Sequence, residues 1–464
     1  MKQLSELMFF KPQALHFTGI GGIGMSGLAE ICLAAGCPVS GSDLKPSAVT
    51  ERLAALGARV EQGHRAENLG EAEALVATSA AAYDNPELAE ARRRGLPIVR
   101  RGELLAELMR QRTGIAMAGS HGKTTTTAMA AAIALHAGLD PTVAVGGRLP
   151  ELGGATARLG RGRHLIAESD ESDGSFLELA PVVSVITNVD REHLDHYGSF
   201  EKVREAFAQF ANRTAFYGTV VLCADDAEAS ALEPGIRRRV LRYGRGAAAE
   251  LRIGAETGGA EGSSFTLAWR GADLGEFRLG VVGAHSVLNA AAAAGAALSI
   301  GVEPDMIRGA LAAYRGVARR LELKGRAAGV TVVDDYGHHP TEIRATLAAL
   351  RRLKPGRLAA LFQPHRYTRT RDLMDEFADC FSEADLVRVT ELYPASEAPI
   401  AGVSGEALAA RLGAAGHPDA RYAGPLEDAA RSLARELRPG DLALTLGAGS
   451  VTQAGAWILE SLKE

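Results

Sequence analysis

Short apolar runs alternate with longer stretches rich in Ala, Glu and Arg along the first hundred residues. The runs Ala14–Thr18 and Pro38–Ser42 predict buried strands, and Ser26–Ala35 between them predicts a helix. Two more short strands are expected at Val60–Glu61 and Ala74–Thr78. This repeated strand-helix order is typical of an open parallel sheet.

The same alternation continues through the middle of the chain and then changes. Gly114–Met117 predicts a strand and Ala128–Ala137 a helix, and further strands are predicted at His164–Ala167 and Val182–Thr187. Between Gly244 and Phe277 polar and apolar residues alternate and glycines are frequent, so we expect antiparallel hairpins inserted into this region.

The last part of the chain again alternates strands with helices. It contains four predicted strands, at Thr331–Asp334, Leu358–Phe362, Leu386–Thr390 and Leu442–Leu446. The sequence therefore predicts an α/β protein with a doubly wound C-terminal sheet. We place three domains at residues 1–112, 113–317 and 318–464.

Composition narrows the class of protein. The 464 residues are 47% hydrophobic and 23% charged, with a net charge of −5, which disfavours nonspecific binding to nucleic acid. The four cysteines form no C-x-x-C pair and no zinc spacing. Glu6 and Pro12 interrupt any signal-peptide core, and the small-residue run Ala290–Ile300 is too short to span a bilayer. We expect a cytoplasmic protein with reduced thiols.

The most informative motif is a glycine-rich turn followed by a lysine and hydroxyl residues. Gly119 to Thr127 reads G-S-H-G-K-T-T-T-T, between a predicted strand and a predicted helix. Glycines allow backbone N–H groups to approach phosphate, Lys123 would neutralise the β- and γ-phosphates, and the Thr124 hydroxyl would bind Mg²⁺. The standard pattern G-x-x-x-x-G-K-[ST] has a glycine five residues before Gly122, where this chain has Met117. The alternative is a glycine turn that merely caps a helix.

A second glycine cluster follows the first predicted strand. Gly19, Gly21 and Gly24 form G-x-G-x-x-G, and Asp43 lies about twenty residues further on. This pattern also occurs in NAD-dependent dehydrogenases. Because the chain already has a triphosphate motif, we interpret this turn as the site of a second, phosphorylated substrate. Glycines needed only for tight packing are the structural alternative.

Two acidic clusters follow predicted strands of the middle region. They are Glu168–Phe176 and Thr187–Tyr197. Carboxylates at strand ends of a nucleotide-binding sheet are where Mg²⁺ contacts phosphate, and Glu168 leaves its strand first. A solvated loop edge is the alternative.

Histidines and arginines gather after two strands of the C-terminal region. The clusters Asp334–Glu342 and Phe362–Arg371 should share one edge of the sheet. Together they offer imidazoles, a phenol and guanidinium groups that could hold a small anion such as an amino-acid carboxylate.

The order of GIGGIGMSGLAE, GSHGKTTTT, ESDESD, NVDREHLDHY, HSVLNAAAA, RRLE, DDYGHHPTE and FQPHRYTRT resembles the Mur ligase family across essentially the whole chain. The resemblance implies a Rossmann-like N-terminal domain, a central P-loop-type ATPase sheet and a Rossmann-like C-terminal domain. It implies ATP and two Mg²⁺ ions as cofactors, and UDP-N-acetylmuramate and L-alanine as substrates in peptidoglycan synthesis. We expect a monomer or homodimer, with no nucleic-acid partner and no membrane insertion.

The resemblance also assigns residues to each ligand. For the sugar nucleotide it implies Gly21, Gly22, Gly24, Met25, Ser26 and Asp43. For ATP it implies Gly119, Ser120, His121, Gly122, Lys123, Thr124, Thr125, His285, Asn289, Arg320 and Asp335. For the metal it implies Thr124, Glu168 and His193, and for L-alanine Tyr336, His338, His365, Arg366 and Arg369. Lys123, His193 and Arg320 are the expected catalytic residues.

Three positions depart from the family pattern. Leu321 stands where an aromatic residue usually follows the double arginine, and Thr156 occupies a place often held by Asn. The stretch Phe207–Phe216 contains no lysine, so the carbamylated lysine of some relatives is not expected here.

The implied chemistry is amide formation through an acyl phosphate. The carboxylate of the sugar nucleotide takes the γ-phosphoryl group of ATP, and the amine of L-alanine then displaces phosphate. Either His193 or His338 could take the amine proton. Three alternatives stay open: a ligase for another amino acid or a peptide, a dehydrogenase, and a regulatory nucleotide-binding module without catalysis.

Overall fold

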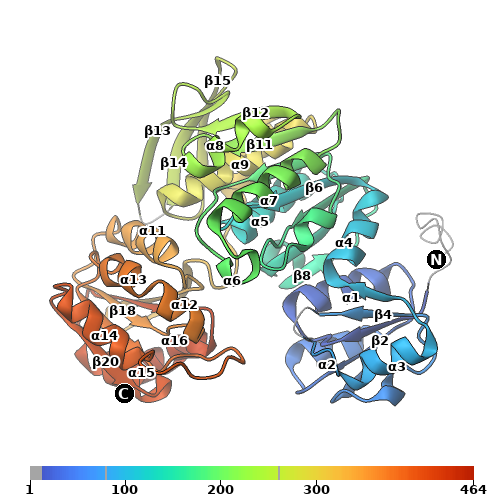
Figure 1. The fold of residues 1–464 in the computed structure, drawn as a ribbon. Coiled ribbons are helices and arrows are strands. Elements are labelled where there is room, and N and C mark those ends of the chain that lie inside the picture. The colour runs from blue at the N-terminus through green and yellow to red at the C-terminus, as the bar shows by residue number, and fades with distance from the viewer. Residues whose placement is uncertain (1–12, 79–80, 260–261) are drawn as a thin grey trace. The chain divides into compact units, whose positions relative to one another are not determined.

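The computed structural model describes residues 13–78, 81–259 and 262–464 (Figure 1). Glu6 and Pro12 lie outside the described residues. The chain separates into two compact units. The first runs to Tyr314, apart from segments 256–264 and 279–287, which belong with residues 315–464 to the second. Three sheets of five, ten and six strands define three α/β domains.

The N-terminal sheet is parallel throughout, in the order β3-β2-β1-β4-β5. Its strands are β1 Leu15–Thr18, β2 Val39–Asp43, β3 Arg59–Gln62, β4 Ala74–Ala77 and β5 Ile98–Arg100. Its helices are α1 Ile23–Ala34, α2 Ala48–Ala55, α3 Pro86–Arg94 and α4 Arg101–Arg110. The predicted strands are confirmed to within two residues. Helix α1 begins three residues earlier than predicted, directly after the glycine turn.

The central sheet has the order β15-β14-β13-β12-β11-β10-β6-β9-β7-β8. Its strands are β6 Thr113–Ala118, β7 Thr142–Leu149, β8 Ala155–Arg158, β9 His164–Glu168, β10 Val183–Ile186, β11 Thr219–Cys223, β12 Arg239–Gly244, β13 Leu251–Gly259, β14 Gly262–Trp269 and β15 Ala272–Leu279. Its helices are α5 Lys123–His136, α6 Leu194–Tyr197, α7 Phe200–Arg213, α8 Ala227–Ala231, α9 Ala284–Ser299 and α10 Pro304–Ala313. Helix α5 begins five residues before the predicted start.

The predicted hairpin region forms one edge of this sheet. Strand β13 pairs with β12 in parallel, and β14 and β15 follow as successive neighbours at the edge. Strands β14 and β15 are joined by only Arg270 and Gly271, both with positive φ (51° and 87°). A two-residue connection of this kind makes an antiparallel hairpin, which confirms the predicted hairpin in this region.

The C-terminal sheet has the order β16-β17-β21-β18-β19-β20, with only β16 antiparallel among these strands. Its strands are β16 Glu322–Ala327, β17 Val330–Asp335, β18 Leu358–Phe362, β19 Leu386–Thr390, β20 Ala420–Gly424 and β21 Leu442–Leu446. Its helices are α11 Pro340–Arg351, α12 Tyr367–Asp372, α13 Met374–Cys380, α14 Gly405–Ala414, α15 Leu426–Glu436 and α16 Ala454–Ser461.

Two hydrophobic cores lie on the two faces of the C-terminal sheet. Leu358, Ala360 and Phe362 of β18 pack with α11, α13 and α14, whereas Ala359 and Leu361 pack with α15 and α16. Alternate residues of one strand therefore face opposite helix layers, which confirms the doubly wound arrangement.

None of the helices in the described part of the chain combines the length and the apolar character needed to cross a membrane. All four cysteines are buried and unpaired by disulfides.

Phe362 is the best test of the C-terminal core. It is fully buried, and its ring lies 5.6 Å from that of Phe377 and 5.2 Å from that of Phe381. We expect Phe362→Ala to lower the free energy of unfolding of this region by about 3–5 kcal/mol, because the cavity cannot collapse in a packed core. Urea denaturation followed by circular dichroism measures the change. Leu323→Ala, at a position 56% exposed, is the control and should change it by less than about 0.5 kcal/mol. Equal losses of stability in the two variants would contradict the assignment of Phe362 to the C-terminal core.

Candidate active site

The phosphate turn has the backbone geometry that its glycines predict. Gly119 and Gly122 have φ angles of 137° and 82°, which L-residues rarely adopt, and Gly122 is the N-cap of α5. A Cβ on Gly119 would collide with the Thr187 hydroxyl, and one on Gly122 would lie 2.6 Å from the Asn289 side-chain oxygen. Both positions therefore require glycine for conformation and for space.

Segment Thr187–Asp190, after β10, braces this turn through hydrogen bonds. The Ser120 and His121 N–H groups donate to the Asn188 backbone and side-chain oxygens (3.2 and 2.8 Å). The Asn188 amide and the Thr187 hydroxyl donate to the His121 carbonyl (3.0 and 2.6 Å), and the Asp190 N–H donates to the Ser120 hydroxyl (2.8 Å). The N–H groups of Ser120 and His121 thus donate to Asn188 within the protein. The amides from Gly122 to Thr125, in the first turn of α5, are the ones placed for an anion.

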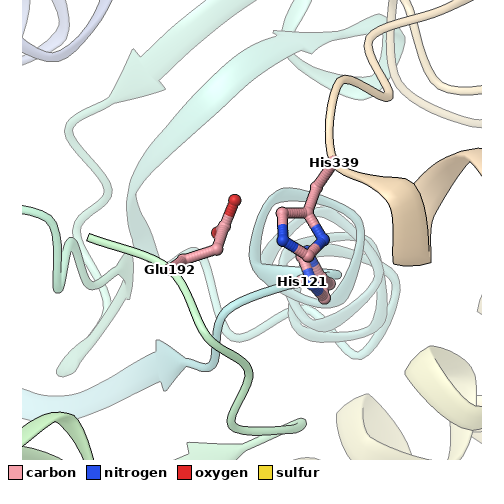
Figure 2. A group of neighbouring side chains, drawn as sticks. All are labelled: His121, Glu192 and His339. Carbon is pink, nitrogen blue, oxygen red and sulfur yellow. The ribbon is translucent and has the colours of Figure 1, made fainter. Parts of the chain in front are cut away.

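His121 and Glu192 lie on the loops after β6 and β10, in the first unit. The His121 ring nitrogen Nε2 lies 2.8 Å from an Asp190 carboxylate oxygen, and His121 and Glu192 have metal-binding atoms within 4.8 Å of one another (Figure 2). The aspartate orients the imidazole, which had been expected only as a nucleotide contact.

Lys123, the first residue of α5, is held by an ion pair and two carbonyls. Its ammonium lies 2.7 Å from Glu171, 2.6 Å from the Gly119 carbonyl and 2.9 Å from the Ser120 carbonyl. Burial alone would lower the pKa of Lys123, but the charges of Glu171 and Glu192 outweigh it and raise that pKa well above its usual range. The lysine is therefore a permanent cation at the turn.

The expected metal ligands fall into two neighbouring groups. The Thr124 hydroxyl donates to Glu168 (2.9 Å), whose other oxygen accepts from the Gly146 N–H (2.7 Å). His193 instead joins Glu171 and Glu192, and the ligand atoms of these three residues lie within 4.8 Å of one another. His193 has a φ of 56°, a strained backbone of the kind that clusters at functional sites.

Carboxylates outnumber cations around Lys123. Burial raises the pKa of Glu171 to about 7, and the neighbouring Asp170 and Glu192 add to the rise against the pull of Lys123. Oxygen ligands with surplus negative charge are what a divalent cation such as Mg²⁺ prefers, so Glu168, Glu171, Glu192 and Thr124 fit that metal. His193 is the less usual ligand for it.

The residues expected at the adenine share helix α9. His285 and Asn289 are four residues apart and so lie on one face, one turn from each other. Asn289 is 7% exposed and lies against Gly122, at the phosphate turn. The structure thus links Asn289 directly to the turn.

The N-terminal glycine turn is hydrogen-bonded to Asp43. The Gly21 N–H donates to the Asp43 carboxylate (2.9 Å), and α1 starts from Gly22 as N-cap. Met25 and Ser26 are buried residues of α1, and the Ser26 N–H donates a hydrogen bond to the Gly22 carbonyl. The backbone amides in the first turn of α1, which includes Gly24, are therefore placed to bind a phosphate. The side chains of Met25 and Ser26, also expected to contact the sugar nucleotide, are not placed to do so.

A pocket opens beside Asp43 at the carboxyl ends of β2 and β3. Its volume is about 190 Å³, and it is lined by Asp43, Lys45, Pro46, Thr50, Glu51, Ala54, Val60, Glu61 and Gln62. It adjoins the glycine turn through Asp43.

In the second unit, an aromatic and cationic cluster follows β17. The guanidinium groups of Arg319 and Arg320 lie 4.9 and 5.0 Å from the centre of the Tyr336 ring. The Tyr336 and His338 rings meet edge to face at 5.4 Å. Arg319 (φ 62°) and Leu321 (φ 49°) flank Arg320 with strained backbone, at the position where the family pattern is broken. His339, also labelled in Figure 2, is the N-cap of α11.

The cluster after β18 meets the one after β17, as predicted. The His365 ring lies 5.9 Å from His338, stacks on Tyr393 at 5.4 Å and lies 3.5 Å from the Arg369 guanidinium. Burial, with Arg369 and Arg366 nearby, lowers the pKa of His365 to about 4. The imidazole is therefore neutral at pH 7, and the arginines supply the positive charge for a carboxylate ligand.

Asp335, which the resemblance places beside the ribose, is held by hydrogen bonds from its own domain. It is 5% exposed, and its oxygens accept from the Leu321 and Gly337 N–H groups (both 2.8 Å) and from the Thr346 hydroxyl (3.2 Å). These bonds make it the residue that fixes the loops around Arg320 and Tyr336.

Several site residues were not singled out from the sequence. Glu171, Asn188, Asp190 and Glu192 lay within the quoted motifs without an assigned role, whereas Tyr393 and Glu397 lay outside them. Glu397 holds Thr368 (2.6 Å) at the start of α12, beside Arg366. Tyr393 and Glu397 follow β19, the neighbour of β18, so the rule that strand ends gather at one edge could have found them.

Comparison with known proteins agrees with this arrangement. Residues 14–113 match the family model described as "Mur ligase family, catalytic domain", residues 117–297 the "Mur ligase middle domain" and residues 319–449 the "Mur ligase, glutamate ligase domain". These matches define a three-domain ligase. The chain belongs to the Mur ligase family.

Similar proteins cover the whole chain. A UDP-N-acetylmuramate–L-alanine ligase of Solibacter usitatus is 56% identical over 100% of this chain and 98% of its own length. A protein of the same name from Koribacter versatilis is 51% identical over 98% of each chain. The crystal structure of UDP-N-acetylmuramate-alanine ligase from Thermotoga maritima is 30% identical, with a TM-score of 0.81 over 97% of this chain and 98% of that one. The fold expected from the resemblance is confirmed, and the dehydrogenase alternative is set aside.

Gly119→Ala tests the geometry of the phosphate turn. The added methyl would collide with the Thr187 hydroxyl at a φ of 137°, so we expect ATP affinity to fall at least tenfold and stability to fall by about 1–3 kcal/mol. Isothermal titration with ATP and thermal unfolding measure the two effects. Gly246→Ala is the matched control, because nothing lies within 4 Å of its Cβ position. Normal ATP binding by the Gly119 variant would contradict the assigned turn.

Proposed function

We propose that this protein joins L-alanine to the lactoyl carboxylate of UDP-N-acetylmuramate, with conversion of ATP to ADP and phosphate. The observation that carries the proposal is the contact of Thr124 with Glu168 beside Lys123, whose side chain is only 16% exposed, within a chain 47–56% identical to several proteins named for this activity. Enzymes of the Mur ligase family use ATP, and the product belongs to peptidoglycan synthesis. We further propose that the protein is cytoplasmic, is a monomer or homodimer, and has no nucleic-acid partner.

The first chemical step overcomes the poor electrophilicity of a carboxylate. A carboxylate oxygen of the sugar nucleotide attacks the γ-phosphorus of ATP, the bond between the γ-phosphorus and the β,γ-bridging oxygen breaks, and ADP leaves. Lys123 and the first-turn amides of α5 stabilise the charge on the transferring phosphoryl group. Mg²⁺, when bound by Thr124 and the neighbouring carboxylates, supplies further positive charge on the phosphate oxygens.

The second step forms the amide. The amine nitrogen of L-alanine attacks the acyl carbon, and the bond from that carbon to the phosphate oxygen breaks. The amine proton passes to a base, for which His193 and His338 are the two candidates. Arg366 and Arg369 would hold the amino-acid carboxylate, while neutral His365 avoids adding a titratable charge at neutral pH.

The direct test is ADP release with Mg²⁺, ATP and UDP-N-acetylmuramate, adding L-alanine, glycine, L-serine or a peptide singly. Release that needs both the sugar nucleotide and L-alanine, with the coupled product found by mass, supports the proposal. Release that answers only to a peptide would assign the chain to another branch of the family. Nucleotide binding without any product would favour the regulatory alternative.

Lys123→Ala should abolish amino-acid-dependent phosphate release, since the transferring phosphoryl group loses its fixed cation. Binding of UDP-N-acetylmuramate, measured by calorimetry, should be unchanged, because we propose that it binds at the N-terminal sheet. Lys463→Ala, an exposed position, serves as control. Retained turnover in the Lys123 variant would remove the lysine from the mechanism.

Arg366→Ala should raise the KM for L-alanine at least tenfold while changing that for ATP less than twofold, because a charged hydrogen bond to the substrate carboxylate is lost. Steady-state kinetics with each substrate varied measures this. Arg371→Ala removes a second arginine of α12, paired with Asp372 at 2.7 Å, and should leave both values unchanged. Equal rises for ATP and L-alanine would place the amino-acid site elsewhere.

A further inference from the structure

A fully buried carboxylate lies within the N-terminal sheet domain. Glu87, in the first turn of α3, accepts hydrogen bonds from the Thr18 hydroxyl (2.9 Å), the Ser42 hydroxyl (2.7 Å) and the Asn68 amide (2.7 Å). His16 Nε2 lies 3.4 Å away. No residue of the mechanism above explains why a charge is buried here.

The donors keep this carboxyl ionised. Burial alone would raise the pKa of Glu87, but His16, Asn68 and Ser42 outweigh it and lower that pKa to about 2. An ionised carboxylate can only accept hydrogen bonds, so every polar neighbour must present a proton to it.

The network lies at the edge of the sheet that carries the glycine turn. Thr18 is the last residue of β1 and immediately precedes Gly19. Ser42 immediately precedes Asp43, which accepts from the Gly21 N–H. Glu87 thus ties the ends of both strands from which the proposed sugar-nucleotide site is built.

The network also fixes a proton on His64. Ser42 has one hydroxyl proton and donates it to Glu87, so its oxygen must accept at the contact with His64 Nδ1 (2.8 Å). His64 Nδ1 therefore carries a proton, and in the ring form with a single proton Nε2 is left as an acceptor. The His64 side chain is 19% exposed, against 0% for Glu87, and it follows β3 at the same edge. Among the described residues, no hydrogen-bond partner of Nε2 is found.

We propose that Glu87 is a positioning residue that acts through Ser42 to hold His64 as a hydrogen-bond acceptor for the sugar nucleotide. The recognised group is a donor of the nucleoside part, either a ribose hydroxyl or an imide N–H. The inference rests on the proposed function, because it takes this edge as the sugar-nucleotide site.

Glu87→Gln should reverse the direction of the hydrogen bonds that link residue 87, Ser42 and His64. The Asn68 amide, which also donates to the Gly63 carbonyl (2.9 Å), is fixed as a donor. The oxygen of the introduced side-chain amide must therefore face Asn68, and its NH₂ group must face Thr18 and Ser42. Because their hydroxyls can rotate, Ser42 then donates to His64 Nδ1 and the imidazole proton moves to Nε2. We expect the KM for UDP-N-acetylmuramate to rise about tenfold, with kcat and the KM values for ATP and L-alanine changed less than twofold.

The tautomer is measured separately by nitrogen-15 NMR of the histidine rings in the free protein. We expect an Nδ1–H signal for His64 in the wild type and an Nε2–H signal in the Glu87→Gln variant. His64→Phe assigns the resonance and should raise the same KM. An Nε2–H tautomer in the wild type, or an unchanged KM in a folded Glu87→Gln variant, would overturn the proposal.

Two further variants separate positioning from loss of stability. Asp441→Asn removes another buried carboxylate, which accepts from Arg357 (3.2 Å) and the Arg438 N–H (2.8 Å), and should lower the melting temperature without raising this KM. If Glu87→Gln does not fold, Ser42→Ala removes the hydroxyl that links Glu87 to His64 and keeps the Glu87 charge. An unchanged KM for UDP-N-acetylmuramate in that variant also overturns the proposal. Wild-type protein without UDP-N-acetylmuramate-dependent turnover would refute the proposed function, whereas the NMR result would still decide the relay.

Discussion

The active site depends on one largely enclosed lysine, Lys123, placed among more carboxylates than it can neutralise. Lys123 contacts Glu171 at 2.7 Å, and Glu168 and Glu192 add negative charge around it. Because buried charges are costly unless they are paired, this surplus of carboxylates favours a divalent cation in the same place. The electrostatics of these side chains thus support the proposed Mg²⁺ independently of the sequence motif.

The phosphate turn that carries Lys123 is held in place by its backbone conformation and by hydrogen bonds. Two glycines with positive φ and the hydrogen bonds between segment Thr187–Asp190 and residues Ser120 and His121 hold the turn before any ligand binds. Preorganised dipoles need little rearrangement when charge develops during phosphoryl transfer. In each sheet the chemistry is carried by loops at the carboxyl ends of parallel strands, as open α/β sheets require.

Much of the fold was predictable because its strands are short apolar runs bounded by turn residues. The strands Leu358–Phe362, Leu386–Thr390 and Leu442–Leu446 were predicted with correct bounds. Helix α5 was predicted too short because Lys123–Thr127 is polar, although Gly122 caps the helix before it. The continuity of β13–β15 with the central sheet was not predictable, since pairing with β12 depends on tertiary contacts that local alternation does not contain.

The candidate site shows the same division. Motif spacing located Lys123, Thr124, Glu168 and the His338–His365 pair. It could not show that Asn188 accepts hydrogen bonds from the Ser120 and His121 N–H groups, because hydrogen-bond partners depend on the folded backbone. For the same reason it could not show that Asp335 accepts from the Leu321 and Gly337 N–H groups.

The central claim is that this site activates a carboxylate by phosphorylation, and oxygen-18 in that carboxylate tests it most directly. UDP-N-acetylmuramate labelled in the lactoyl carboxylate would be turned over with ATP and L-alanine, and the released phosphate analysed by mass spectrometry. The account predicts one labelled oxygen in the phosphate for each amide formed from doubly labelled carboxylate. Amide formation with unlabelled phosphate would contradict it.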